Sequence, residues 1–107
     1  LTYFVLVLKE TNSPIGNCGL LKRETLEDVD IGYSLLPEYH GKGFATEAAK
    51  AMMNYAKEVV QLKKLIAITT EPNVRSINVL KKLGMTFEKK FWMEGDTEEL
   101  MMFAKNL

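Results

Sequence analysis

The hydrophobic pattern of this chain changes its period at a glycine-containing loop, and this change limits the folds that the chain can adopt. Apolar and polar residues alternate over residues 29–36, which is typical of a β-strand. Over residues 45–60 the apolar residues recur at helical spacing, which predicts an amphipathic α-helix. Gly41 and Gly43 lie between the two patterns. The sequence therefore predicts a strand that runs through a glycine loop directly into a helix.

The rest of the chain adds strands on both sides of this unit and one more helix. Asn73 is a suitable N-cap for that second helix and Gly84 a suitable residue to end it. We expect strands over residues 3–8, 15–22, 29–36, 65–70, 87–93 and 99–104, and helices over residues 45–60 and 74–83. The last two strands would form a hairpin with its turn at residues 94–96. The predicted order is βββ-α-β-α-ββ, an α/β (α+β) mixed sheet in which the crossover makes one pair of strands parallel.

Length and composition restrict the remaining choices. The chain has 107 residues, which is the size of one domain, so we treat residues 1–107 as a single unit. Lys and Arg number 14, as do Asp and Glu, so no overall charge attracts the protein to nucleic acid or to a membrane. The single cysteine, Cys18, and the single histidine, His40, exclude a disulfide framework and a Cys/His zinc site. We expect a cytoplasmic protein without a metal, in which Cys18 is a small buried apolar residue.

The glycine loop has the properties of an anion site. Gly41 and Gly43 allow a ligand to approach the main chain, and the first turn of a helix offers unpaired N–H groups at its positive end. Lys42 adds a charge, Ala45 is small, and Thr46 adds a hydroxyl donor. The spacing fits neither a Walker loop nor a dinucleotide fingerprint. Residues 41–46 therefore predict a phosphate site, and the alternative is a tight strand-to-helix turn without a ligand.

Two segments resemble conserved motifs of the GCN5-related N-acetyltransferase (GNAT) family. Residues 40–45, His-Gly-Lys-Gly-Phe-Ala, fit the pattern [Q/R]-x-x-G-x-[G/A], and residues 31–37 look like the strand that precedes it. Residues 73–85 resemble the second conserved helix of the family. Their Asn-x-x-Ser form is similar to the ribosomal-protein-alanine acetyltransferase-like subgroup.

The resemblance implies direct transfer of an acetyl group from acetyl-CoA, as co-substrate, to a primary amine of a protein N-terminus or a small molecule. It also implies roles for individual residues of this chain. The backbone at the end of the third strand would meet the pantetheine arm, the glycine loop the pyrophosphate, and the start of the second helix the pantetheine and sulfur. The residues implied are Leu35, Leu36, His40, Gly41, Lys42, Gly43, Phe44, Ala45, Thr46, Asn73 and Ser76.

The catalytic groups are implied less directly. Leu80 occupies the place where many family members carry a tyrosine that protonates the leaving thiolate. Ser76 is then the hydroxyl expected to support the thiolate, and Glu88 is the expected base. The alternatives are that Ser76 only satisfies backbone groups of its helix, and that Glu88 is a solvent-facing strand residue. Asp30 is a second carboxylate to consider, and we expect Tyr33 to serve packing rather than acid catalysis.

The family fold starts with a strand and two helices that this sequence does not supply. Because the chain begins inside a β-rich run at Leu1, we expect it to be part of a longer protein or to complete itself by pairing. An apolar first strand at the edge of a sheet also favours a homodimer. The expected partners are acetyl-CoA and an amine acceptor, with neither nucleic acid nor membrane. The alternative functions are a non-catalytic acyl-CoA-binding module and a dimerisation domain.

Overall fold

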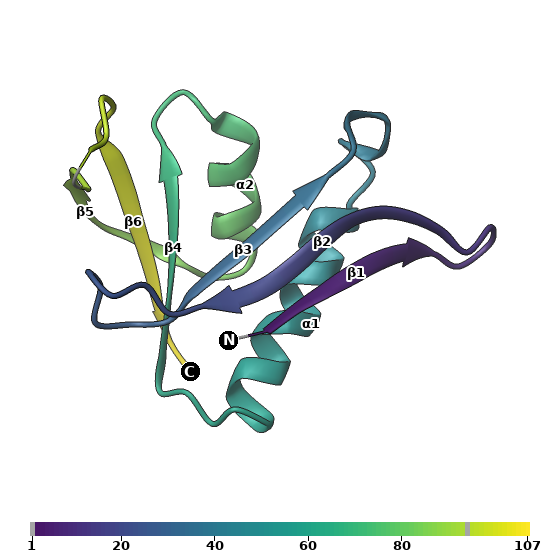
Figure 1. The fold of residues 1–107 in the computed structure, drawn as a ribbon, viewed down its shortest axis with the longest axis horizontal. Coiled ribbons are helices and arrows are strands. Elements are labelled where there is room, and N and C mark those ends of the chain that lie inside the picture. Colours follow the sequence, from purple (N-terminus) through teal and green to yellow (C-terminus); the bar gives the residue numbers. More distant parts are fainter. Residues whose placement is uncertain (1, 94) are drawn as a thin grey trace.

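The computed structural model describes residues 2–93 and 95–107, and its elements follow the predicted order (Figure 1). The strands are β1 (Thr2–Leu8), β2 (Ser13–Leu21), β3 (Asp30–Leu35), β4 (Lys64–Thr70), β5 (Thr86–Phe91) and β6 (Leu100–Asn106). The helices are η1 (Pro37–Tyr39), α1 (Phe44–Glu58) and α2 (Val74–Lys82). The predicted turn at residues 94–96 includes Glu94, which lies outside the described residues.

The six strands form one mixed sheet with the order β1-β2-β3-β4-β6-β5. The strands β1, β2 and β3 are an antiparallel meander, and β6 lies between β4 and β5 and is antiparallel to both. The crossover through α1 makes β3 and β4 parallel. The predicted βββ-α-β-α-ββ arrangement and its mixed sheet are therefore confirmed.

Most of the predicted element boundaries differ from the structure by one or two residues, and local backbone geometry explains some of these differences. The helix α1 ends at Glu58 rather than at residue 60, because the chain turns away and reaches a left-handed conformation at Gln61 (φ 64°). A short 3₁₀ turn, η1, was not predicted and begins at Pro37, whose fixed φ suits a helix start. The strand β2 begins at Ser13 because a tight turn, with Asn12 at φ 58°, returns the chain early.

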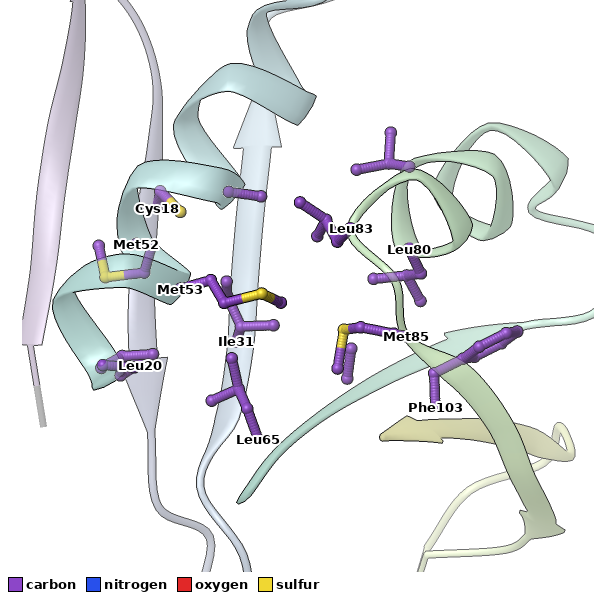
Figure 2. Packing of buried hydrophobic residues seen from close by; sticks show 14 of the residues in the cluster. Cys18, Leu20, Ile31, Met52, Met53, Leu65, Leu80, Leu83, Met85 and Phe103 are labelled. Atoms are coloured by element: carbon purple, nitrogen blue, oxygen red, sulfur yellow. The ribbon is translucent and has the colours of Figure 1, made fainter. Parts of the chain in front are cut away.

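The core lies between the sheet and the two helices. Figure 2 shows Leu20 on the sheet beside Met52 and Met53 of α1, with Leu80 of α2 and Phe103 of β6 in the same cluster. The buried residues of α1 are Ala49, Met52, Met53 and Ala56. Their spacing of three, four and seven places them on one face of the helix, as the sequence pattern predicts. Both helices pack against the sheet and contact each other, which fixes where each of them begins.

The first strand leaves apolar side chains exposed. Tyr3, Val5 and Val7 are 59%, 69% and 49% exposed, although β1 is paired along its length with β2. Alternate residues of a strand share one face, so these three lie on the same side of the sheet. The prediction that this strand pairs with a second copy of the chain stays a prediction.

We predict that Leu65→Ala lowers the free energy of unfolding by about 2–5 kcal/mol, because Leu65 is fully buried in the centre of the sheet. The matched control is Val5→Ala on the exposed face of β1, which should change the free energy by about 0.5 kcal/mol or less. Urea unfolding followed by circular dichroism measures both. Equal losses in the two variants would mean that the core is not where the structure has it.

Candidate functional site

The principal cavity lies where β3 and β4 separate. The two strands pair in parallel register at one position, Asp30 with Ile66, and then diverge towards their carboxyl ends (Figure 1). A cleft of about 440 Å³ opens between them. It is lined by residues 31–35 of β3, residues 67–70 of β4 and the first turns of α2. In an α/β sheet, a crevice at the carboxyl ends of neighbouring parallel strands is the usual place for a ligand.

A second, smaller hollow of about 210 Å³ adjoins the cleft at the start of α1. The two cavities share Leu35, His40, Ala45, Arg75 and Val79 in their linings. The remaining lining of the smaller hollow comes from the loop, from the start of α1 and from α2. These residues are Tyr39, Gly41, Gly43, Phe44, Thr46, Asn78 and Lys82. The hollow therefore has the helix start on one side and two cationic residues of α2 on the other.

The glycine loop adopts a backbone that favours glycine. Gly41 has φ 76° and Gly43 has φ 83°, both in the left-handed region. Open space surrounds the position of a Cβ atom at each. Gly43 is also the N-cap of α1, so no side chain at this position bonds to the first amides of the helix. The loop thus leaves the positive end of a 15-residue helix open to an anion.

His40 holds the loop against the end of β3. Its Nε2 lies 3.0 Å from the carbonyl oxygen of Leu35. Because a carbonyl oxygen can only accept, Nε2 must donate its hydrogen in this bond. The histidine therefore positions the loop, as well as lining both cavities.

Two of the predicted ligand-binding residues lie beside the cavities rather than in their linings. The ammonium of Lys42 lies 5.8 Å from the centre of the Tyr39 ring, in a cation–π contact. Leu36 is 47% exposed, and its backbone N–H donates to the carbonyl of Ile15 on β2. The other nine predicted residues line the cleft or the smaller hollow. The structure thus brings most of the predicted set together.

The start of α2 brings a hydroxyl into the cleft. Asn73 caps the helix, with its Oδ1 accepting from the backbone N–H of Ser76 at 3.1 Å, as the sequence predicts. The hydroxyl of Ser76 lies 3.4 Å from the hydroxyl of Tyr33 on β3. The hydroxyl of Ser76 therefore faces across the cleft from α2 towards β3. Ser76 thus has a contact outside its own helix, and its role in the chemistry stays a prediction.

The candidate base Glu88 does not lie in the cleft. Its Oε1 is 3.0 Å from the ammonium of Lys64, on an exposed part of β5. Asp30 is buried, and its Oδ2 accepts from Arg23 Nε at 2.6 Å. Glu88 therefore lies in a surface ion pair outside the cleft, and its role as the base stays a prediction. The buried carboxylate of Asp30 is paired with the partly exposed guanidinium of Arg23. No carboxylate is among the described residues that line the cleft.

Cys18 is excluded as a nucleophile by its surroundings. It is 1% exposed, and burial raises the pKa of its thiol from 9.0 to about 11. The reactive form of a cysteine is the thiolate, which is scarce at neutral pH when the pKa is this high. The expected role as a small buried apolar residue is confirmed by its place in the core.

The sequence matches the acetyltransferase (GNAT) domain family over residues 1–86. The chain belongs to this family. The glycine loop at the start of α1 and the lining of the cleft, apart from Leu100, lie within the matched residues. The resemblance drawn from residues 40–45 and 73–85 is confirmed by this match.

Three relatives show how far the similarity extends. The chain is 33% identical over 88 residues to the "Uncharacterized N-acetyltransferase YnaD" of Bacillus subtilis, covering 82% of this chain and 52% of that protein. It is 43% identical over 58 residues to the spermidine N(1)-acetyltransferase of Escherichia coli, covering 54% of this chain and 31% of that protein. The ribosomal-protein-S5-alanine acetyltransferase of Vibrio fischeri has a solved structure that superposes with a TM-score of 0.83 at 27% identity, covering 97% of this chain and 60% of that one. The chain spans about half the length, or less, of these two curated relatives.

Sequence reasoning missed three residues of the site. Tyr33 was expected to serve packing, yet its hydroxyl reaches Ser76. Arg75 and Lys82 were not predicted, yet both line the hollow at the loop. These two are seven residues apart, which places them on one face of a helix, so their shared direction was readable from the sequence. That this face is turned towards the loop depends on the packing of α2 against α1.

No group of three or more His, Cys, Asp or Glu side chains in residues 2–93 and 95–107 is arranged to hold a metal ion. Over the same part of the chain, no helix is long and apolar enough to span a membrane.

We predict that Cys18 reacts slowly with a thiol reagent in the native protein. At pH 8 a pKa of about 11 should make the rate roughly a hundredfold or more lower than that of an unperturbed thiol, and burial lowers it further. The rate with a chromogenic disulfide is compared with and without urea. Equal rates in the folded and unfolded protein would contradict the burial of this side chain.

Proposed function

We propose that this domain binds acetyl-CoA and transfers its acetyl group directly to a primary amine. The observation that carries the proposal is the continuity of two cavities: the open helix start at Gly43 and the cleft between β3 and β4 share part of their lining. A ligand with a diphosphate at one end and a long uncharged arm fits such a pair of cavities. Membership of the GNAT family supports acetyl-CoA as that ligand.

The binding roles follow the chemistry of each part of the site. We assign the pyrophosphate to residues 41–46 at the positive end of α1, with Arg75 and Lys82 adding charge from α2. We assign the pantetheine arm to the end of β3 beside Leu35, in the manner of an added strand. The thioester then lies towards Asn73 and Ser76. Leu36 flanks this path and has no direct role in the proposal. Within residues 41–46, Lys42 lies beside the hollow, over the ring of Tyr39, rather than in its lining.

The transfer step asks little of a base when the acceptor is an α-amine. The neutral amine attacks the carbonyl carbon, the carbon–sulfur bond breaks, and the amine gives its extra proton to water. An α-amine has a pKa of about 7.7–8.0, whereas a lysine-like amine has about 10.4. Because no carboxylate lines the described part of the cleft, we favour a weakly basic acceptor such as a protein N-terminus over a polyamine.

A second candidate function is a non-catalytic acyl-CoA-binding module. It is favoured by Leu80, a fully apolar residue in the wall of the cleft at the place where many family members carry a tyrosine acid. This module would bind acetyl-CoA without turnover. A dimerisation domain, the third candidate, would not bind it. We further propose a cytoplasmic location, without a nucleic-acid or membrane partner. A homodimer, if the chain forms one, would pair through β1.

We predict that Ala45→Asp lowers the affinity for CoA by about tenfold or more. The new carboxylate lies in the first turn of α1. There it occupies the proposed anion site and repels a diphosphate. The control is Ala51→Asp, the same change on an exposed position of the same helix, which should leave affinity within about twofold. Isothermal calorimetry with CoA measures both. Equal affinity in the two variants would refute the site.

We predict that the wild-type protein transfers acetyl faster to a peptide with an N-terminal alanine than to spermidine at pH 7. The reason is the larger neutral fraction of the α-amine at this pH. Release of free CoA thiol, followed with a chromogenic reagent, reports both rates, and mass spectrometry identifies the product. Binding of acetyl-CoA without transfer to any amine would favour the non-catalytic module, and faster transfer to spermidine would refute the preference.

A further inference from the structure

Two hydroxyl groups from distant parts of the chain meet in the cleft. Tyr33 lies on β3 and Ser76 in the first turn of α2, and their hydroxyl oxygens are 3.4 Å apart. The two residues are 43 positions apart in the sequence, so the contact depends on how β3 and α2 pack. Both side chains line the cleft. The pair therefore sits beside the part of the cleft to which the proposed function assigns the thioester.

We propose that Tyr33 supplies the proton that the leaving thiolate of CoA takes up, and that Ser76 passes this proton on. The inference rests on the proposed acetyl transfer and adds to it a residue on a different element. Ser76 is the group that would meet the sulfur, and Tyr33 acts through it. Tyr33 thus acts on the thiolate only through Ser76 and does not itself contact the substrate.

The pKa values of the thiol, the phenol and the serine hydroxyl require a second proton donor that replaces the proton of Ser76. A thiol has a pKa of about 8.5 and a phenol about 10, so a phenol can hand a proton to a thiolate at small cost. An aliphatic hydroxyl is a much weaker acid than either and can donate only if its own proton is replaced at once. Leu80 cannot take part, since it is apolar and 1% exposed. Of the groups that contact Ser76 in the structure, Tyr33 has the acidity that the step needs.

The proton movements balance as follows. When the carbon–sulfur bond breaks, its electron pair stays on sulfur, and Ser76 gives its proton to that thiolate. Ser76 takes the phenol proton of Tyr33 in the same movement. The phenolate that remains is reprotonated by water, which carries the proton released earlier by the acceptor amine. No metal, oxidant or further reactant is required.

The surroundings of Tyr33 keep it protonated at neutral pH. Burial raises the pKa of Tyr33, while the hydrogen bond with Ser76 opposes this rise. Cys18 on β2 lies opposite Tyr33 in the sheet, and its thiol is neutral because its own pKa is about 11. The groups that face the cleft from the loop and from α2 are His40 and Arg75. The phenol is therefore available as an acid over the physiological range.

The test is Tyr33→Phe, which removes the hydroxyl and keeps the ring. We expect kcat for acetyl transfer to fall by about tenfold or more, with the affinity for CoA within about twofold of wild type. The matched control is Tyr55→Phe, a tyrosine of α1 whose ring packs edge-to-face on Phe4 of β1. That variant should keep its kcat. A lost kcat with retained affinity separates a role in the chemical step from a role in binding.

The pH dependence provides a readout that a purely structural role would not change. In the wild type, kcat should fall as pH rises through the raised pKa of Tyr33, because the phenolate has no proton to give. Tyr33→Phe should lose this alkaline limb. In the protein without ligand, carbon-13 NMR of labelled tyrosine should show that Ser76→Ala raises the pKa of Tyr33 further, since it removes the hydrogen bond that lowers it.

The outcomes separate this inference from the proposed function. If the wild type transfers acetyl and Tyr33→Phe matches it in kcat and pH profile, the proton role of Tyr33 is overturned and the proposed function stands. If kcat and CoA affinity fall together, Tyr33 is a binding residue, and the inference is overturned as well. If the wild type fails to bind acetyl-CoA, or binds it without transfer to any amine, the proposed function falls and this inference falls with it.

Discussion

The pairing of β3 with β4 stops after a single residue pair, Asp30 with Ile66, and the site exists because the two strands then separate. Pairing along their full length would fill the cleft with backbone. In the chain, η1, the glycine loop and α1 follow β3, and α2 follows β4; both α-helices pack on one core. The divergence of the two strands therefore determines both where α1 begins and where Ser76 lies relative to the cleft. The proposed ligand site and the proposed chemistry therefore depend on one feature of the sheet.

The charges of this protein act locally. Its net charge is zero, yet the start of α1 and the cationic residues Arg75 and Lys82 surround one hollow. Several acidic side chains are engaged elsewhere: Asp30 with Arg23, and Glu88 with Lys64. The Glu88 pair is partly exposed and contributes little to stability. The consequence is a site that attracts an anion within a protein that has no overall field.

The sequence was a good guide to local structure and a poor one to contacts between distant residues. The period change after Gly43, the N-cap at Asn73 and the order of elements were all readable, because each depends on neighbours along the chain. The meeting of Tyr33 with Ser76 was not, because it depends on the packing of α2 beside β3. The ion pair of Glu88 with Lys64, outside the cleft, was not readable for the same reason: a motif position does not say which way the side chain of an edge strand is turned.

The central claim is that CoA occupies the cleft between β3 and β4 with its diphosphate at the start of α1. The most direct test is a titration of nitrogen-15-labelled protein with CoA, followed through the backbone amide signals. The account predicts the largest shifts at residues 41–46, at the ends of β3 and β4, and in the first turn of α2. Shifts confined to the β1–β2 hairpin or to the β5–β6 hairpin, or no shift at saturating CoA, would contradict it.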